Sequence, residues 1–474
     1  MTVVLTGHDL DRAALVRVAR DGEAAELHPS AIQRMARSRD VVRTAIERGD
    51  PVYGLTTAVG VLKRAAVSAG GASDYSRRMI RHHVVGQGPA AAPDLVRATM
   101  LRLANAFAEG STGVRPKLAE RLVAALNRGD LPRIRTLGSI GQADLAPMAD
   151  LALAVFGEVP LEPGEGLALV GSNAFSTGWA ALAIADSAVL LEAAEVAGAL
   201  SLEALSANLT ILDPAIAEVR PYPGLQLELG RLRQLLEGSG LWDPGAARSL
   251  QDPLTFRNLP QMLGAWRDVL DHVDRQLAIE LNASQGNPIV VPADERVISV
   301  ANFEILPLVV ALDYLRIVLA TALTSVAERV IKLLETPWSG LPTGLVSGND
   351  PTDPGLSYLA IAGQSLAAEA RLLAQPVSFE VVSTAHAEGI EDRSTMAPLA
   401  ASRLGELVDR GRRLVAIELT VAGQAAQLRG HRLGRGTAAG LKKVRSRVPY
   451  VEPGGMVPDV EPLLELIARG AIRL

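Results

Sequence analysis

Two side chains in this sequence of 474 residues have the types needed for proton transfer and for anion binding. Tyr53 begins a loop in which Gly54 and Gly60 flank small residues, and this composition permits movement around a phenol. A free phenol has a pKa near 10, so Tyr53 could take a proton at neutral pH only if nearby cations or dipoles lowered that pKa by roughly two units. Arg257 presents a planar guanidinium that can hold a carboxylate through two parallel hydrogen bonds. Taken alone, the two residues could also pack at a loop base or form an ordinary ion pair.

Several short segments place glycines and charged residues at fixed positions. They read Tyr-Gly-Leu-Thr-Thr-Ala-Val-Gly at 53–60, Arg-His-His-Val-Val-Gly at 81–86, Gly-Ser-Ile-Gly-Gln-Ala-Asp-Leu-Ala-Pro at 138–147, Gly-Glu-Gly-Leu-Ala-Leu at 164–169, Gln-Asp-Pro-Leu-Thr-Phe-Arg at 251–257 and Glu-Asp-Arg-Ser-Thr-Met at 391–396. In order and spacing they resemble the histidine and phenylalanine (aromatic amino acid) ammonia-lyase family. The resemblance extends from about residue 50 to residue 430.

The resemblance implies a fold and a set of roles. The fold is mainly α, a long-helix bundle of the ammonia-lyase (fumarase/aspartase-like) type, assembled as a homotetramer in which three chains build each active site. Tyr53 would be the general base that takes the β-proton, and Arg257 would hold the α-carboxylate of the substrate. His83 and Glu391 match positions that surround the imidazole ring in the histidine-specific members.

One segment departs from the family at its catalytic centre. In that family, an Ala-Ser-Gly tripeptide at this position cyclises and loses water to form the electrophile 4-methylideneimidazol-5-one (MIO). Here only Gln142 and Ala143 stand between Gly141 and Asp144. Ring closure needs a serine followed by a glycine whose nitrogen can approach a carbonyl, and neither Ser139 nor Ser172 is followed by one. We therefore expect no MIO, and we predict no other cofactor and no metal.

Further departures accompany this one. Where the family has an asparagine and a tyrosine beside the electrophile, this chain has Gly171 or the shifted Asn173, and Leu254. Glu304, in the Asn-Phe-Glu-Ile of residues 302–305, replaces a histidine. The predicted substrate-binding residues are thus His83, Gln142, Asn173, Leu254, Arg257, Glu304 and Glu391, beside the predicted catalytic Tyr53.

An elimination without the electrophile needs a substrate that brings its own leaving group. Trimethylammonium is such a group, and the family relative ergothionase, which lacks MIO, expels trimethylamine from ergothioneine. We hypothesise an MIO-independent lyase that acts on a histidine-like amino acid or betaine. Two alternatives stay open: an enzyme repurposed for cyclisation, addition or proton transfer on a natural-product intermediate, and a non-catalytic homologue that binds a ligand or pairs with an active subunit.

The composition limits partners and location. Hydrophobic residues make up 48% and aromatic residues 3%, which favours packed helices rich in Ala and Leu. A net charge of −5 gives no basic stripe for nucleic acid. The absence of cysteine and of a secretory signal at the first residues fits a cytoplasmic protein. Charges within the apolar stretches 177–212 and 305–334 indicate core helices and no membrane span.

Proline, glycine and polar residues that interrupt the apolar runs predict where the helices and strands end. Helices are expected up to Asp213-Pro214, over 225–236 and over 258–281, with a short extended run at 288–291. The breaks at 338–355 and 376–393 are predicted to be site-lining loops. We expect an N-terminal region, 1–195, that carries the tyrosine loop and the degenerate MIO segment, and a helical region over 196–474.

Overall fold

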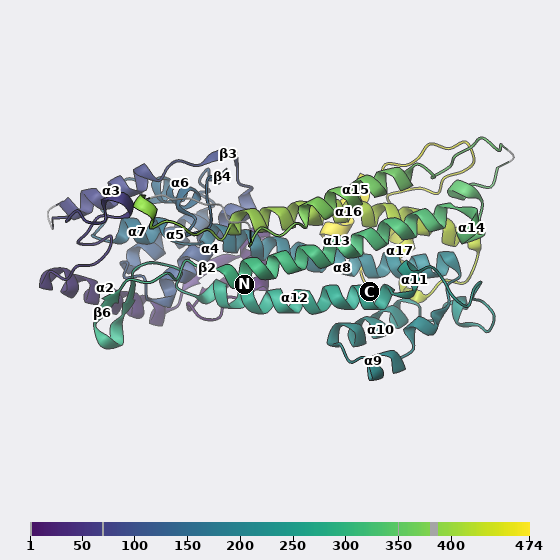
Figure 1. Cartoon of the computed structure of the whole chain (residues 1–474), viewed down its shortest axis with the longest axis horizontal. Helices are drawn as coiled ribbons and strands as arrows, with labels where there is room; N and C mark the ends of the chain where they lie inside the picture. Colours follow the sequence, from purple (N-terminus) through teal and green to yellow (C-terminus); the bar gives the residue numbers. More distant parts are fainter. Residues whose placement is uncertain (1, 69–70, 349, 380–386) are drawn as a thin grey trace. The chain divides into compact units, whose positions relative to one another are not determined.

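The computed structural model describes residues 2–68, 71–348, 350–379 and 387–474. Helices make up most of these ranges, and the strands form two-stranded pairs (Figure 1). The expectation of a mainly α-helical chain is confirmed.

The chain forms two compact units, each built from three segments. Unit 1 comprises residues 1–185, 273–313 and 376–402, and unit 2 comprises 186–272, 314–375 and 403–474. Both units therefore combine early, middle and late parts of the chain. The division at residue 195 expected from the sequence stays a prediction.

Unit 1 holds the strands and the shorter helices of the N-terminal half. Its elements are β1 (Thr2–Leu5), α1 (Arg12–Arg20), β2 (Ala24–Leu27), α2 (Pro29–Arg48), η1 (Gly60–Leu62), α3 (Ala72–His82), β3 (Gln87–Ala90), α4 (Pro93–Glu109), α5 (Pro116–Arg128), β4 (Arg135–Leu137), α6 (Leu145–Phe156), α7 (Glu165–Val170), β5 (Ile289–Val291), η5 (Pro292–Asp294), β6 (Arg296–Ile298) and η7 (Ala387–Gly389). β1 and β2 pair in parallel, whereas β3–β4 and β5–β6 are antiparallel. α4 packs against α1, α2 and α5, and α7 packs against α3 and α6.

Unit 2 is built from helices in the described residues. Its own elements are η3 (Leu209–Leu212), α9 (Ala215–Val219), α10 (Pro223–Leu235), η4 (Gly240–Trp242), α11 (Leu254–Arg257), α14 (Thr336–Ser339), η6 (Thr343–Leu345), α15 (Leu359–Leu373), α17 (Arg435–Arg445) and α18 (Glu461–Ala468). Four long helices contribute residues to both units: α8 (Ala174–Leu205), α12 (Leu259–Asn282), α13 (Leu306–Leu334) and α16 (Ala397–Arg429).

Buried polar contacts join the long helices within unit 2. Trp266 of α12 is buried, and its indole Nε1 donates to Ser187 Oγ of α8 at 3.1 Å. Arg329 of α13 forms a buried pair with Glu418 of α16, and Ser201 of α8 donates to the same carboxylate at 2.8 Å. Because a buried polar group without a partner is costly, these contacts fix which helix faces meet.

The predicted elements agree with the structure in part. The runs expected at 225–236, 258–281 and 288–291 correspond to α10, α12 and β5. The helix expected to reach Asp213 instead ends at Leu205, because Ser206 takes a left-handed conformation with φ of 58° and η3 follows. The predicted break at 338–355 contains η6, and residues 380–386 of the other predicted loop lie outside the described residues.

By length and composition, α13 could cross a membrane. In its most apolar window 61% of the residues are buried inside the structure. Core helices of water-soluble proteins have the same property, so this helix is weak evidence for a span.

Candidate functional site

A cavity of about 150 Å³ in unit 1 collects several of the predicted site residues. Tyr53, His83, Gln142 and Glu391 all line it, although they are far apart in the sequence. The other lining residues are Val59, Gly60, Ala143, Leu145, Leu167, Gly171, Asn287 and Phe303. A phenol, an imidazole, an amide and a carboxylate thus share one small chamber with apolar walls.

Tyr53 is half-buried, and its hydroxyl oxygen accepts a hydrogen bond of 3.0 Å from the backbone N–H of Gly60. Burial raises the pKa of Tyr53, the Gly60 N–H opposes that shift, and the negative charge of Glu391 adds to it. The direction is the reverse of the lowering that a base at neutral pH requires. Arg257 belongs to unit 2 and is not among the groups that act on Tyr53.

His83 caps the C-terminus of α3 and has a defined hydrogen-bond polarity. Its Nδ1 lies 2.7 Å from the carbonyl oxygen of Met79. A carbonyl can only accept, so Nδ1 carries a proton, and when the ring is neutral the lone pair is on Nε2. The pocket can therefore receive an N–H donor from a ligand at this position.

The segment at residues 141–144, where the sequence predicts that the MIO tripeptide is missing, is tightly held. Gly141 has φ of +83°, and its carbonyl accepts from Thr395 Oγ1 at 2.8 Å and from Asn173 Nδ2 at 2.9 Å. A Cβ at Gly141 would lie 2.2 Å from Thr395 Oγ1, so this position requires glycine. Asp144 is fully buried and accepts from Ser139 and Ser176, while burial raises its pKa to about 6.

Gln142 lies within this segment, and its side-chain amide donates a hydrogen bond to Glu304. Its Nε2 lies 2.8 Å from Glu304 Oε2, and Arg393 Nε lies 3.5 Å from the same oxygen. The residues between Gly141 and Asp144 do not fit MIO formation, because neither is a serine or a glycine. The side chain in that place is instead an amide anchored to a carboxylate.

The remaining predicted residues lie elsewhere. Asn173 is fully buried and supports Gly141, and its Oδ1 has no hydrogen-bond partner among the described residues. Arg257 lines a cavity of about 290 Å³ in unit 2, where its Nη1 donates to Gln251 and its buried Nε has no partner in the described ranges. Leu254 is 65% exposed at the start of α11.

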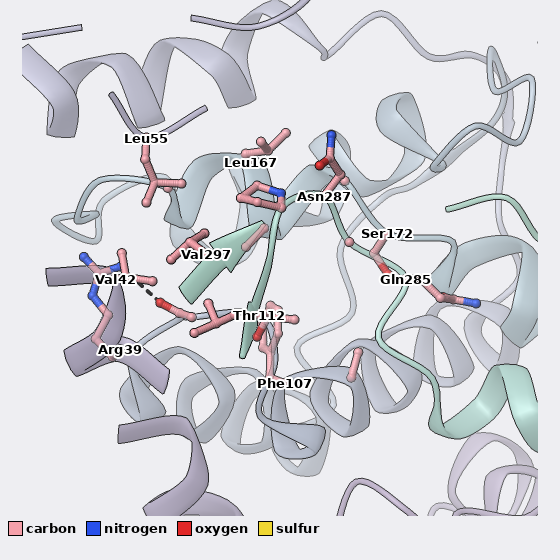
Figure 2. A pocket seen from close by; sticks show the side chains of 18 of the residues that line it. Arg39, Val42, Leu55, Phe107, Thr112, Leu167, Ser172, Gln285, Asn287 and Val297 are labelled. Carbon is pink, nitrogen blue, oxygen red and sulfur yellow. Dashed lines mark hydrogen bonds between the residues drawn. The ribbon is translucent and has the colours of Figure 1, made fainter. Parts of the chain in front are cut away.

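A second cavity in unit 1 shares Leu167, Gly171 and Asn287 with the first (Figure 2). Figure 2 shows Arg39 and Val42 on one side of it and Gln285 on the other. Its volume of about 30 Å³ suits one or two waters rather than a substrate. The larger Tyr53 cavity is therefore the better candidate for the site.

Glu165, in the Gly-Glu-Gly-Leu-Ala-Leu motif, supports the cavity wall. Its buried carboxylate accepts from Arg115 Nε at 2.7 Å and from the backbone N–H of Glu162 at 2.7 Å. A Cβ at Gly166 would lie 2.3 Å from the carbonyl oxygen of Ser76, so glycine permits the close contact between α7 and α3. This motif positions Leu167 and makes no contact that indicates chemistry.

Sequence reasoning missed some of the residues around Tyr53. The hydroxyl of Tyr75 accepts from the backbone N–H of Val59 at 2.9 Å, next to the Gly60 N–H that bonds to Tyr53. Asn287 and Phe303 line the cavity as well. Phe303 directly precedes Glu304 and could have been suspected, whereas nothing in the sequence points to Tyr75.

Comparisons with known proteins place this helical fold and its pocket in a class. The family model for aromatic amino acid lyases matches residues 10–161 and 158–446. The chain is 36% identical to the histidine ammonia-lyase of Symbiobacterium thermophilum over 500 aligned positions, covering 100% of this chain and 98% of the relative. The chain therefore belongs to the aromatic amino acid lyase family.

Solved structures agree with this assignment. The ergothionase of Treponema denticola, in complex with desmethyl-ergothioneine sulfonic acid, superposes with a TM-score of 0.93 at 27% identity, covering 100% of this chain and 99% of that one. The tyrosine aminomutase of Streptomyces globisporus gives 0.91 at 27% identity over 100% and 98% of the two chains. The predicted family and fold are confirmed, and so is the expectation of an enzyme of the carbon-nitrogen lyase type.

Proposed function

We propose that this protein is an MIO-independent lyase that eliminates an amine from a histidine-like amino acid or betaine, with ergothioneine and its trimethylammonium group as the leading example. The observation that carries the proposal is Gln142, which stands where the family forms its electrophile and is bonded to Glu304. The structural likeness to an ergothionase supports it. No step of the proposed reaction passes through an electrophilic prosthetic group.

The retained residues account for the proton and the ring. The Tyr53 phenolate would take the proton from Cβ, the electron pair of that C–H bond would form the Cα–Cβ double bond, and the amine would leave with the electrons of the Cα–N bond. A neutral His83 would accept a hydrogen bond at Nε2 from a ring N–H, and Glu391 lines the same cavity. Burial raises the pKa of Tyr53. The positive charge of a bound betaine would lower this pKa and so favour the phenolate.

The proposal also assigns a carboxylate clamp. Arg257 in unit 2 keeps a buried Nε without a partner among the described residues, so part of its guanidinium is available. We propose that it holds the substrate carboxylate in a homotetramer, at a site to which more than one chain contributes.

The test is direct. Purified protein is incubated with histidine, histidine betaine and ergothioneine, and proton NMR follows the appearance of ammonia or trimethylamine and of a conjugated acrylate. We expect a betaine to be consumed and Tyr53→Phe to abolish its consumption while the protein stays folded. If none of the three compounds is consumed, the elimination is wrong as proposed.

A second measurement tests MIO independence. The intact mass should equal the sequence mass, whereas MIO formation removes two waters. A deficit of two waters would contradict the proposal whatever the substrate.

Two other functions remain candidates. The exposed Leu254 on α11, in place of a tyrosine, would suit a site remodelled for cyclisation or addition on another intermediate. A non-catalytic homologue would have no need for a phenol, an imidazole and a carboxylate in one cavity, so the shared lining of Tyr53, His83 and Glu391 favours an enzyme.

A further inference from the structure

The wall of the Tyr53 cavity that lies at the MIO position is polar, and its hydrogen bonds fix the polarity. Gln142 lines the cavity, and its amide is the nearest described replacement for the missing group. An amide has one end that donates and one end that accepts. Which end faces a ligand therefore decides what this wall can bind.

Glu304 settles the orientation of that amide. An ionised carboxylate can only accept hydrogen bonds, so the NH₂ end of Gln142 must point to Glu304 Oε2, at 2.8 Å. Glu304 is itself anchored, because its Oε1 accepts from the backbone N–H of Leu306 at 3.2 Å and Arg393 Nε lies 3.5 Å from Oε2. The carbonyl Oε1 of Gln142 is then the end left for a ligand.

From this geometry we infer that Gln142 and Glu304 form the specificity element for a cationic amine on the substrate, with Gln142 as the contact and Glu304 as the positioning residue. This inference rests on the proposed function and names the ligand class of the same cavity. The wall that is electrophilic in MIO enzymes here presents a carbonyl dipole with a carboxylate charge behind it. The carbonyl dipole attracts a positive group, and the charge of Glu304 adds to that attraction to the extent that Arg393 does not offset it.

The backbone around Gln142 supports a fixed rather than an adaptable wall. Thr395 Oγ1 and Asn173 Nδ2 both donate to the carbonyl of Gly141, and Thr395 and Asn173 are fully buried. Met396 N–H donates to the carbonyl of Ile140 at 2.9 Å. The Gln142 side chain therefore extends from an immobilised peptide, as a selective contact requires.

The experiment measures binding and does not depend on turnover. Isothermal titration compares histidine betaine with 3-(imidazol-4-yl)propionate, which has the same ring and carboxylate but no amine. We expect the wild type to bind the betaine about tenfold more tightly, through the attraction between the trimethylammonium charge and the carbonyl dipole, because a quaternary nitrogen has no N–H to donate. Glu304→Gln should remove that preference while leaving the affinity for the propionate unchanged, because the Gln142 amide is then free to turn.

Three further variants separate positioning from folding. Glu304→Asp keeps the charge and should restore part of the preference, and Gln142→Met keeps the length without the carbonyl and should abolish it. Glu120→Gln, an exposed change on α5, should leave both affinities unchanged. Should Glu304→Gln keep the full betaine preference, the inference is overturned even if the elimination is observed.

The remaining outcomes separate the inference from the proposed function. Betaine preference that depends on Glu304, without any turnover, supports the inference and counts against the elimination. If neither ligand binds, both are overturned together.

Discussion

At the scale of single residues, the chemistry of this protein depends on how burial shifts the proton affinity of two groups. Tyr53 is the proposed base, and its pKa is raised by burial and by Glu391. Asp144 holds the segment next to Gln142, and burial raises its pKa to about 6. Burial therefore moves the ionisation of both groups to higher pH in the folded chain, with consequences for activity and for stability.

The first residue-scale prediction concerns the pH profile. Because the pKa of Tyr53 is raised, the phenolate is scarce at neutral pH in the free enzyme. We expect kcat/KM to rise about tenfold per pH unit up to about pH 10 without levelling off, because the raised pKa lies above that range. A bound betaine favours the phenolate. The rise of kcat with pH should therefore occur at lower pH than the rise of kcat/KM. Steady-state kinetics at pH values from about 6 to about 10 provide the measurement.

A flat profile would remove Tyr53 as the base. Tyr450→Phe is a suitable control, since this phenol lies in unit 2 and also has a raised pKa. Its removal should leave the profile unchanged.

The second residue-scale prediction concerns stability. The folded state binds the proton of Asp144 more tightly than the unfolded chain does, because the pKa of an aspartate in the unfolded chain is near 3.8. Its stabilising contribution is complete below that value and is lost as the pH rises through about 6. Relative to Asp144→Asn, the wild type should lose about 3 kcal/mol of unfolding free energy between acid and neutral pH.

Urea denaturation of both proteins at several pH values measures this difference. Asp40→Asn, which removes an exposed carboxylate paired with Arg43, should show no comparable trend. A constant difference between Asp144→Asn and the wild type would mean that the buried carboxylate titrates normally.

At the scale of elements, the sequence located helices better than it located their ends and partners. α10 and α12 follow apolar periodicity and were expected within a few residues, because periodicity reports the buried face of a helix. The end of α8 was placed too late, because the left-handed turn at Ser206 has no strong signal in the sequence. The partner helices depend on contacts such as Arg329 with Glu418, which pair residues of distant segments.

The element-scale prediction uses that pair. Arg329 Nε and Nη2 donate to the two oxygens of Glu418 at 2.5 and 3.0 Å, and both side chains are buried. Arg329→Met alone leaves an unpaired buried carboxylate and should cost about 3–5 kcal/mol. Replacing both residues by Met should recover most of that loss, and a double-mutant cycle by urea denaturation measures the coupling.

The exposed pair of Glu465 on α18 and Arg469, the residue that follows this helix, is the control. Its N–O distance is 2.6 Å, yet both side chains are largely exposed, so Arg469→Met should cost less than about 1 kcal/mol. Equal costs for the two single changes would show that burial does not govern the Arg329 pair.

At the scale of the whole molecule, the two residues proposed as base and carboxylate clamp belong to different units. The Tyr53 cavity is complete within unit 1, whereas Arg257 belongs to unit 2. We expect a homotetramer of four times the chain mass by light scattering. If Tyr53 and Arg257 of one site come from different copies, two inactive variants can restore each other's function.

The complementation experiment co-expresses Tyr53→Phe with Arg257→Met. Each variant alone should be inactive, and random mixed tetramers should regain about a quarter of wild-type activity, because each site then receives both native residues with that probability. Mixed tetramers without activity would show that the two residues act within one chain. The activity of each variant expressed alone, with its folding confirmed, serves as the baseline.

The sequence by itself determined the helical class, the family and the fact that Gln and Ala occupy positions 142–143, because residue types and their order along the chain carry those features. The tertiary structure alone decided that Gln142 is anchored by Glu304, that Asn173 supports a backbone carbonyl, and that the pKa of Tyr53 is raised. Burial, hydrogen-bond direction and local charge arise only when distant segments meet, and a linear pattern does not contain them.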